Sequence, residues 1–240
     1  MTVAENPLYK DLVKQFGDAL HDAAFITEKP KQIISVSPKL DLALGGGVPE
    51  GSLFIMTGPE KIGKTVTALS FCANAQSQER FVYYGNIEGR LKKRDLEGIR
   101  ELQLGPEQFQ MVGSSEGNIL SGEDYLGIFD KVVHGHPKSV AVVDSFSALA
   151  AEAELAGELK DIQVMSIQKT QAKWCRRIGN VLPINNVTVV GDNTDETNVT
   201  GSTQVSDASA LLAVASGNAD NPYLINSYMQ YKVCLLYTSD

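Results

Sequence analysis

Largely apolar runs alternate with amphipathic segments along most of the 240 residues. The apolar runs at 51–58, 80–88 and 139–145 are typical of strands that are buried on both faces of a sheet. The segments 66–76 and 122–134 suit helices. Because strands and helices alternate, we expect an α/β fold with a mostly parallel, twisted sheet covered by helices on both faces.

The same pattern predicts further elements on either side of this central part. They are helices at 5–26, 90–103 and 158–182, a helical turn at 38–47, and strands at 32–37, 109–113, 186–193 and 210–216. The first helix is amphipathic and ends before Pro30. The sequence shows no internal repeat and no low-complexity segment, which favours one α/β domain with a small N-terminal appendage.

The loop between the strand at 51–58 and the helix at 66–76 carries the clearest chemistry. It fits the Walker A pattern GxxxxGK[ST] with Gly58, Pro59, Glu60, Lys61, Ile62, Gly63, Lys64 and Thr65. In such a loop, backbone N–H groups and the helix N-terminus bind phosphate. We expect Lys64 to reach the β- and γ-phosphates of ATP and Thr65 to bind Mg²⁺. The strand–loop–helix context favours this interpretation over a chance glycine-rich turn.

Polar residues at the ends of other strands supply the partners that ATP hydrolysis requires. Asp144 follows the apolar run Val-Ala-Val-Val and is the expected second Mg²⁺ ligand, although an aspartate there could also end a strand or cap a helix. Glu88 ends the strand after the Walker A helix, and we expect that strand to neighbour the Walker A strand and to end at the same edge of the sheet. We interpret Glu88 as the catalytic base that orients water, against the alternative of an exposed acid. Asn193, beside Asp192, is the expected polar sensor, or else part of a plain turn.

Composition and charge limit the remaining possibilities. The net charge is −8, which argues mildly against a dedicated nucleic-acid coat. Positive charge is nevertheless clustered, first at 92–94 and then at helical spacing in Lys169, Lys173, Arg176 and Arg177, although each cluster could also be a solvated helix face. The chain has three scattered cysteines and no apolar run of about 18 residues, so we expect a cytoplasmic protein without disulfides, a zinc site or a membrane span.

The segment from Ile34 to Thr65 resembles the beginning of the ATPase core in the RecA recombinase family, and the resemblance extends from about 33 to 215. The resemblance is based on the Ser-x-x-Leu-Asp-x-Ala-Leu-Gly pattern, the GPExxGKT form of Walker A, Glu88, and the Val-Val-Asp-Ser run that ends at Ser145. Phage UvsX-like members are as similar as the bacterial ones, and Asn193 stands where the family has glutamine or, in that phage branch, histidine.

The resemblance implies a division of the chain into three parts, and the sequence also differs from the family at several places. Residues 1–32 would be a polymerisation arm, 33–232 the RecA-like ATPase core, and 233–240 a non-native tail on a chain that lacks the family's C-terminal region. The family's DNA-binding loops would fall near 151–162 and 194–207. The first of these is acidic and the second has no lysine or arginine, and the residues that contact adenine in bacterial members are not evident.

The resemblance implies an ATP- and Mg²⁺-dependent recombinase in the cytoplasm of a bacterial or phage-infected cell. It would form filaments on single-stranded DNA and promote homologous pairing and strand exchange in recombination and repair. Two alternatives stay open. One is a RecA-fold regulator or assembly module that binds ATP without pairing DNA. The other is a ring ATPase related to replicative helicases or RadA.

Overall fold

A computed structural model describes residues 6–20, 31–58, 61–156, 166–193 and 232–236. The chain divides into two units, Met1–Gln32 and Ile33–Asp240. In the first unit, α1 (Pro7–Phe16) begins after Asn6, whose side chain accepts a hydrogen bond from the backbone N–H of Leu8, and it buries none of its residues. The predicted helix at 5–26 was too long, because Gly17 ends α1 and starts the 3-10 turn η2 (Gly17–Ala19). Residues 21–26 lie outside the described ranges.

The second unit is built around a six-stranded sheet with the strand order β5-β4-β6-β7-β3-β8. Its strands are β3 (Leu53–Thr57), β4 (Val82–Asn86), β5 (Phe109–Val112), β6 (Val140–Asp144), β7 (Thr188–Asn193) and β8 (Lys232–Leu236). The first five are parallel to one another, whereas β8 pairs antiparallel with β3 at the edge. The predicted parallel sheet is therefore confirmed. The strand expected at 210–216 lies outside the described residues.

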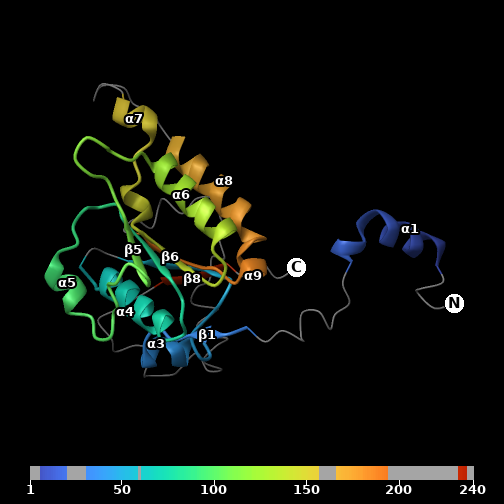
Figure 1. The fold of residues 1–240 in the computed structure, drawn as a ribbon, viewed down its shortest axis with the longest axis horizontal. Helices are drawn as coiled ribbons and strands as arrows, with labels where there is room; N and C mark the ends of the chain where they lie inside the picture. The colour runs from blue at the N-terminus through green and yellow to red at the C-terminus, as the bar shows by residue number, and fades with distance from the viewer. Residues whose placement is uncertain (1–5, 21–30, 59–60, 157–165, 194–231, 237–240) are drawn as a thin grey trace. The chain divides into compact units, whose positions relative to one another are not determined.

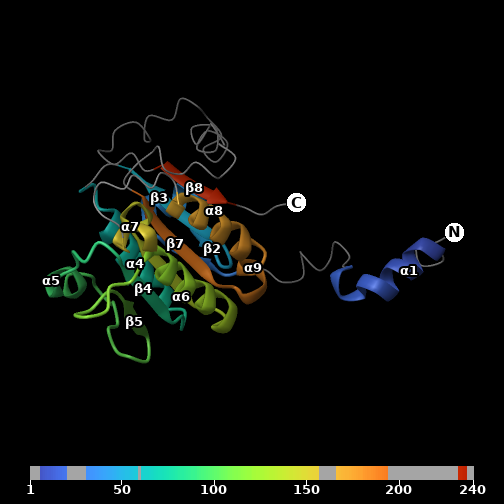
Figure 2. The same cartoon turned by 90° about the horizontal axis from the view of Figure 1, so that it is seen from above.

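Helices cover both faces of this sheet, as Figures 1 and 2 show. The described helices of this unit are α3 (Pro38–Ala43), α4 (Lys64–Gln76), α5 (Lys93–Glu97), α6 (Gly122–Gly135), α7 (Glu152–Ala156), α8 (Ser166–Gly179) and α9 (Leu182–Asn185). The unit also contains the 3-10 turn η3 (Phe146–Ala148) and a small antiparallel pair of strands, β1 (Ile33–Ile34) and β2 (Val48–Pro49).

Alternate side chains of each central strand enter two separate hydrophobic clusters. On β3, Leu53 and Ile55 pack in the cluster that contains residues of α6 and α8. Phe54 and Met56 pack in the cluster that contains residues of α4. A strand with apolar residues on both of its faces is expected where helices cover both sides of a parallel sheet. This double burial explains why the strands appear in the sequence as continuous apolar runs.

Two predicted helices are shorter in the structure than the sequence pattern indicates. The helix expected at 90–103 is only α5, which has Gly98 as its C-cap, and the chain beyond it leaves the helical conformation, with Glu101 at a φ of 68°. The helix expected at 158–182 is α8 followed by the separate α9. Pro183 lies in the first turn of α9 and has no N–H for the carbonyl of Gly179, so one continuous helix would be broken there. Residues 157–165 lie outside the described part.

Candidate nucleotide-binding site

The Walker A loop joins β3 to α4 at the carboxyl edge of the sheet. Gly63 is the N-cap of α4 and has a φ of 97°, in the region that favours glycine. Lys64 begins the helix, and its side chain is 4% exposed. Its Nζ donates a hydrogen bond to the carbonyl of Gly58 at 2.9 Å, so the ammonium lies across the loop. Pro59 and Glu60 lie outside the described residues.

This local geometry gives the loop two features that attract phosphate. The first N–H groups of α4 have no partners within the helix and carry the positive end of its dipole. The Lys64 ammonium adds a full positive charge at the same place. Of the predicted loop residues, Lys61 is exposed with a φ of 62°, and Ile62 is half-buried. A polyphosphate is the ligand that such a combination of charge and N–H groups suits.

Asp144 ends β6 and is 6% exposed. Its Oδ2 accepts a hydrogen bond from the hydroxyl of Tyr84 at 2.5 Å, and the Thr65 side chain also hydrogen-bonds to the carboxylate. Burial raises the pKa of Asp144, while the hydrogen bonds from Tyr84 and Thr65 and the charge of Lys64 oppose that rise. The structure thus brings the two predicted Mg²⁺ ligands into direct contact.

A hydroxyl and a carboxylate are suitable ligands for Mg²⁺, which proteins commonly hold through one or two carboxylates plus substrate phosphates. Within the described ranges, no group of three or more His, Cys, Asp or Glu side chains is placed to hold a metal by itself. Thr65 and Asp144 therefore fit an ion that arrives with a phosphate ligand.

Glu88 follows β4, and its side chain is 20% exposed. Ser145, the residue after Asp144, donates its hydroxyl to Glu88 Oε1 at 2.8 Å. The exposed guanidinium of Arg90 lies 3.2 Å from Oε2. The expectation that β4 neighbours the Walker A strand was wrong, because β6 and β7 lie between β4 and β3. Glu88 nevertheless lies at this edge, because β4 is parallel to β6, β7 and β3, and the Ser145 hydrogen bond links it to the end of β6.

The end of β7 places two polar residues beside the loop. Asp192 and Asn193 are each 3% exposed, and in the β3–β7 register they pair with Met56 and Thr57. Asp192 Oδ1 lies 3.6 Å from Lys64 Nζ, which is an ion-pair distance. Burial raises the pKa of Asp192 to about 7, Lys64 lowers it, and the negative charges of Asp144 and Glu88 raise it further. The Asn193 carbonyl accepts the backbone N–H of Gly58 at 3.3 Å.

Sequence reasoning did not identify Tyr84 and gave Asp192 no role of its own. Tyr84 lies in the middle of β4, where an aromatic residue is typical of ordinary core. A buried tyrosine hydroxyl nevertheless needs a polar partner, and β6 beside it ends in an acid. Asp192 stands next to the expected sensor Asn193, but its contact with Lys64 depends on β7 lying beside β3, which the sequence does not reveal.

The segments that the resemblance predicts to contact DNA are only partly described, since 157–165 and 194–231 fall outside the structure's described residues. In the described part, α7 begins with acidic residues, and the Glu154 carboxylate accepts the backbone N–H of Ala151 at 3.2 Å. On α8, Lys169 and Lys173 are exposed. Arg177 pairs with Asp130 of α6 at 2.8 Å.

In the part of the chain that the structure describes, no helix is both long and apolar enough to cross a membrane.

Comparison with known proteins places this geometry in a family. The RecA N-terminal domain matches residues 9–199. RecA of Rippkaea orientalis is 33% identical over 178 residues, which cover 72% of this chain and 46% of the relative. RecA of Synechocystis sp. is 32% identical over 179 residues, or 74% of this chain and 46% of the relative. RecA of Bifidobacterium longum is 32% identical over 174 residues, or 70% of this chain and 41% of the relative.

The chain spans less than half the length of these curated relatives. The domain match covers most of the chain and includes the Walker A loop, Glu88, Asp144 and Asn193. The strand order brings matched residues from separate strands and from the Walker A loop together, so that Lys64, Thr65 and Asp144 form one site. The chain belongs to the RecA family.

Proposed function

We propose that this chain is the ATPase core of a DNA recombinase that binds ATP with Mg²⁺ and acts on single-stranded DNA. The observation that supports this most is the meeting of Lys64, Thr65 and Asp144 at one edge of a RecA-family sheet, with Glu88 bonded to Ser145 beside them. Bacterial proteins named RecA are similar over most of the chain.

Each residue has a distinct part in this proposal. Lys64 and the N–H groups of α4 bind the phosphates, and Thr65 with Asp144 holds Mg²⁺, which would supply charge neutralisation at the β- and γ-phosphate oxygens. Glu88 orients the attacking water and accepts its proton, while the Ser145 hydroxyl keeps one carboxylate oxygen in place. Asn193, at the end of β7, reports the presence of the γ-phosphate.

Single-stranded DNA and other copies of the chain are the proposed partners. The exposed lysines Lys169 and Lys173 lie one helical turn apart on α8 and form a basic stripe suited to phosphate. Filament formation on DNA would place ATP between adjacent subunits, so that nucleotide and DNA each strengthen binding of the other by the same factor.

The test is binding of a fluorescent single-stranded oligonucleotide with Mg²⁺, with and without ATPγS, followed by electron microscopy of the same samples. We expect an anisotropy increase and helical filaments only when nucleotide is present. Replacing Lys169 and Lys173 with alanine should flatten the plot of log affinity against log salt by about 0.7 for each phosphate that these lysines neutralise in the wild type. Lys131→Ala removes an exposed lysine of α6 and serves as the matched control.

A nucleotide-regulated assembly module that does not pair DNA is the second candidate. The acidic first turn of α7, with Glu152 and Glu154, favours it, because these carboxylates would repel DNA phosphates. Nucleotide binding without any oligonucleotide binding, in this chain and in one extended at its C-terminus, would select this second function.

A further inference from the structure

The hydroxyl of Tyr84 is held against the proposed metal ligand from inside the sheet. Tyr84 has no exposed surface, and its ring stacks on that of Phe109, with centroids 6.1 Å apart and planes inclined by 20°. It pairs with Val142 in the parallel β4–β6 register, two residues before Asp144. The ring therefore has little freedom, and its hydroxyl donates to Asp144 Oδ2 at 2.5 Å.

This contact fixes one half of the Asp144 carboxylate. A carboxylate at the end of a strand can rotate about its side-chain bonds, and each orientation presents a different oxygen to a metal. The tyrosine holds Oδ2, and the Thr65 side chain bonds to the same carboxylate.

We propose that Tyr84 is a positioning residue for Mg²⁺, which it orients indirectly by holding the Asp144 carboxylate beside Thr65. The inference rests on the proposed function, since it assumes that Thr65 and Asp144 hold the ion of a bound nucleotide. Groups that hydrogen-bond to metal ligands from behind commonly change metal affinity by about 10- to 100-fold when they are removed.

The same strand offers a matched control. Tyr83 is the preceding residue, and its hydroxyl lies 2.9 Å from Nδ1 of His136. Its ring packs against the cluster that contains residues of α6, on the other face of the sheet from Tyr84. Tyr83→Phe and Tyr84→Phe therefore remove the same atom from adjacent positions, and only the second change removes a bond to Asp144.

The experiment measures the Mg²⁺ concentration that gives half-maximal binding of a fluorescent ATP analogue to the full chain. For Tyr84→Phe we expect this concentration to rise by about 10- to 100-fold, with Mg²⁺-free binding of the analogue unchanged. Tyr83→Phe should behave as the wild type. In ATP hydrolysis, Tyr84→Phe should need more Mg²⁺ for half-maximal rate but approach the wild-type kcat at saturation.

A double-mutant cycle tests whether Tyr84 acts through Asp144. In an Asp144→Ala background, which removes the acceptor of the Tyr84 hydroxyl, adding Tyr84→Phe should change the Mg²⁺ requirement much less than it does in the wild type. If Tyr84→Phe acted only by loosening β4, it would shift the Mg²⁺ requirement equally in both backgrounds. Circular dichroism and the thermal midpoint in Mg²⁺-free buffer establish that each variant is folded.

The possible outcomes separate this inference from the function on which it rests. If the wild type binds no nucleotide at any Mg²⁺ concentration, the proposed function fails and the inference fails with it. If the wild type shows Mg²⁺-dependent binding and Tyr84→Phe has the same requirement, the inference alone is wrong. An equal shift in Tyr83→Phe, or an undiminished shift in the Asp144→Ala background, also overturns it.

Discussion

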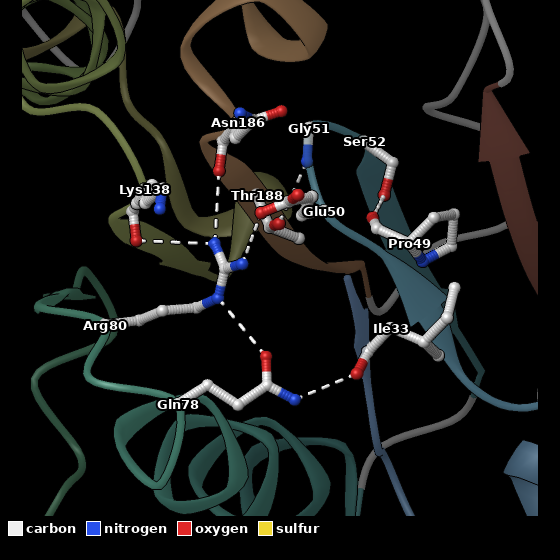
Figure 3. A network of polar contacts seen from close by, with 10 residues as sticks. All are labelled: Ile33, Pro49, Glu50, Gly51, Ser52, Gln78, Arg80, Lys138, Asn186 and Thr188. Atoms are coloured by element: carbon white, nitrogen blue, oxygen red, sulfur yellow. Dashed lines mark hydrogen bonds and ion pairs between the residues drawn. The ribbon is translucent and has the colours of Figure 1, made fainter. Parts of the chain in front are cut away.

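Replacing Arg80 with alanine is expected to lower the free energy of unfolding by about 3–5 kcal/mol, because it removes one partner of a buried ion pair. The Arg80 side chain is 1% exposed and the Glu50 side chain 8%. In Figure 3 the guanidinium points at the Glu50 carboxylate and also donates to the carbonyls of Lys138, at 3.4 Å, and Asn186, at 3.2 Å. Its Nε lies 3.4 Å from the side-chain oxygen of Gln78.

The magnitude follows from what the substitution leaves behind. Loss of the guanidinium leaves a carboxylate at 8% exposure without its cationic partner. It also removes a donor from two backbone carbonyls, and a buried polar group left unsatisfied costs about 1–3 kcal/mol. Replacing both Arg80 and Glu50 with methionine removes the unpaired charge. The double variant should therefore lose less stability than the sum of its two single variants.

Urea unfolding followed by circular dichroism measures these differences. Arg100→Ala is the control, because that arginine is 95% exposed and lies 3.8 Å from Glu101, and a surface pair of this kind should change stability by less than about 1 kcal/mol. Arg80, Lys138 and Asn186 precede strands β4, β6 and β7, at the amino edge of the sheet. The folded fraction of Arg80→Ala should therefore keep its nucleotide affinity. If Arg80→Ala costs no more than Arg100→Ala, the reasoning is refuted.

Three further predictions concern the site. Lys64→Ala should lower ATP turnover by about 10²- to 10³-fold in a coupled assay with the thermal midpoint retained; near-normal turnover would remove the Walker A assignment. Glu88→Gln should retain nucleotide binding and lose about 10²-fold in turnover, whereas wild-type turnover would place the base elsewhere, with Glu60 the next candidate. Burial raises the pKa of Asp192 to about 7, so the contribution of this carboxyl group to wild-type stability falls as pH rises from about 4 to about 7. Asp192→Asn should remove that fall, which is measured as the thermal midpoint of unfolding at each pH. If the variant and the wild type show the same pH profile, this prediction is wrong.

The Walker A loop could be predicted from sequence because its chemistry is local. Gly58 to Thr65 are contiguous, and they are flanked by a continuous apolar run on one side and a largely apolar helical segment on the other. The same holds for Asp144, which ends a run of four apolar residues. A short motif between a recognisable strand and helix can be interpreted from the sequence alone. What the structure adds is the contact between Thr65 and Asp144.

Contacts that depend on strand order could not be predicted in this way. The sequence places β4 after the Walker A helix, but the structure places β6 and β7 between β4 and β3. Crossover connections leave the order of parallel strands free, since each helix can return the chain to more than one position. The approach of Asp192 to Lys64, the hydroxyl contact of Tyr84 and the buried pair of Arg80 and Glu50 all depend on that order.

The observed strand order gives Asp144 a central place in the site. Because β6 lies between β4 and β7, its last residue is reached by Tyr84 of β4 on one side, and β7 brings Asp192 to Lys64 on the other. Ser145 follows immediately and bonds to Glu88. Any displacement of the end of β6 therefore moves the proposed metal ligand and the partner of the proposed base together. Metal binding and hydrolysis should respond jointly to changes on β6, whereas changes at Tyr84 should act on metal binding alone.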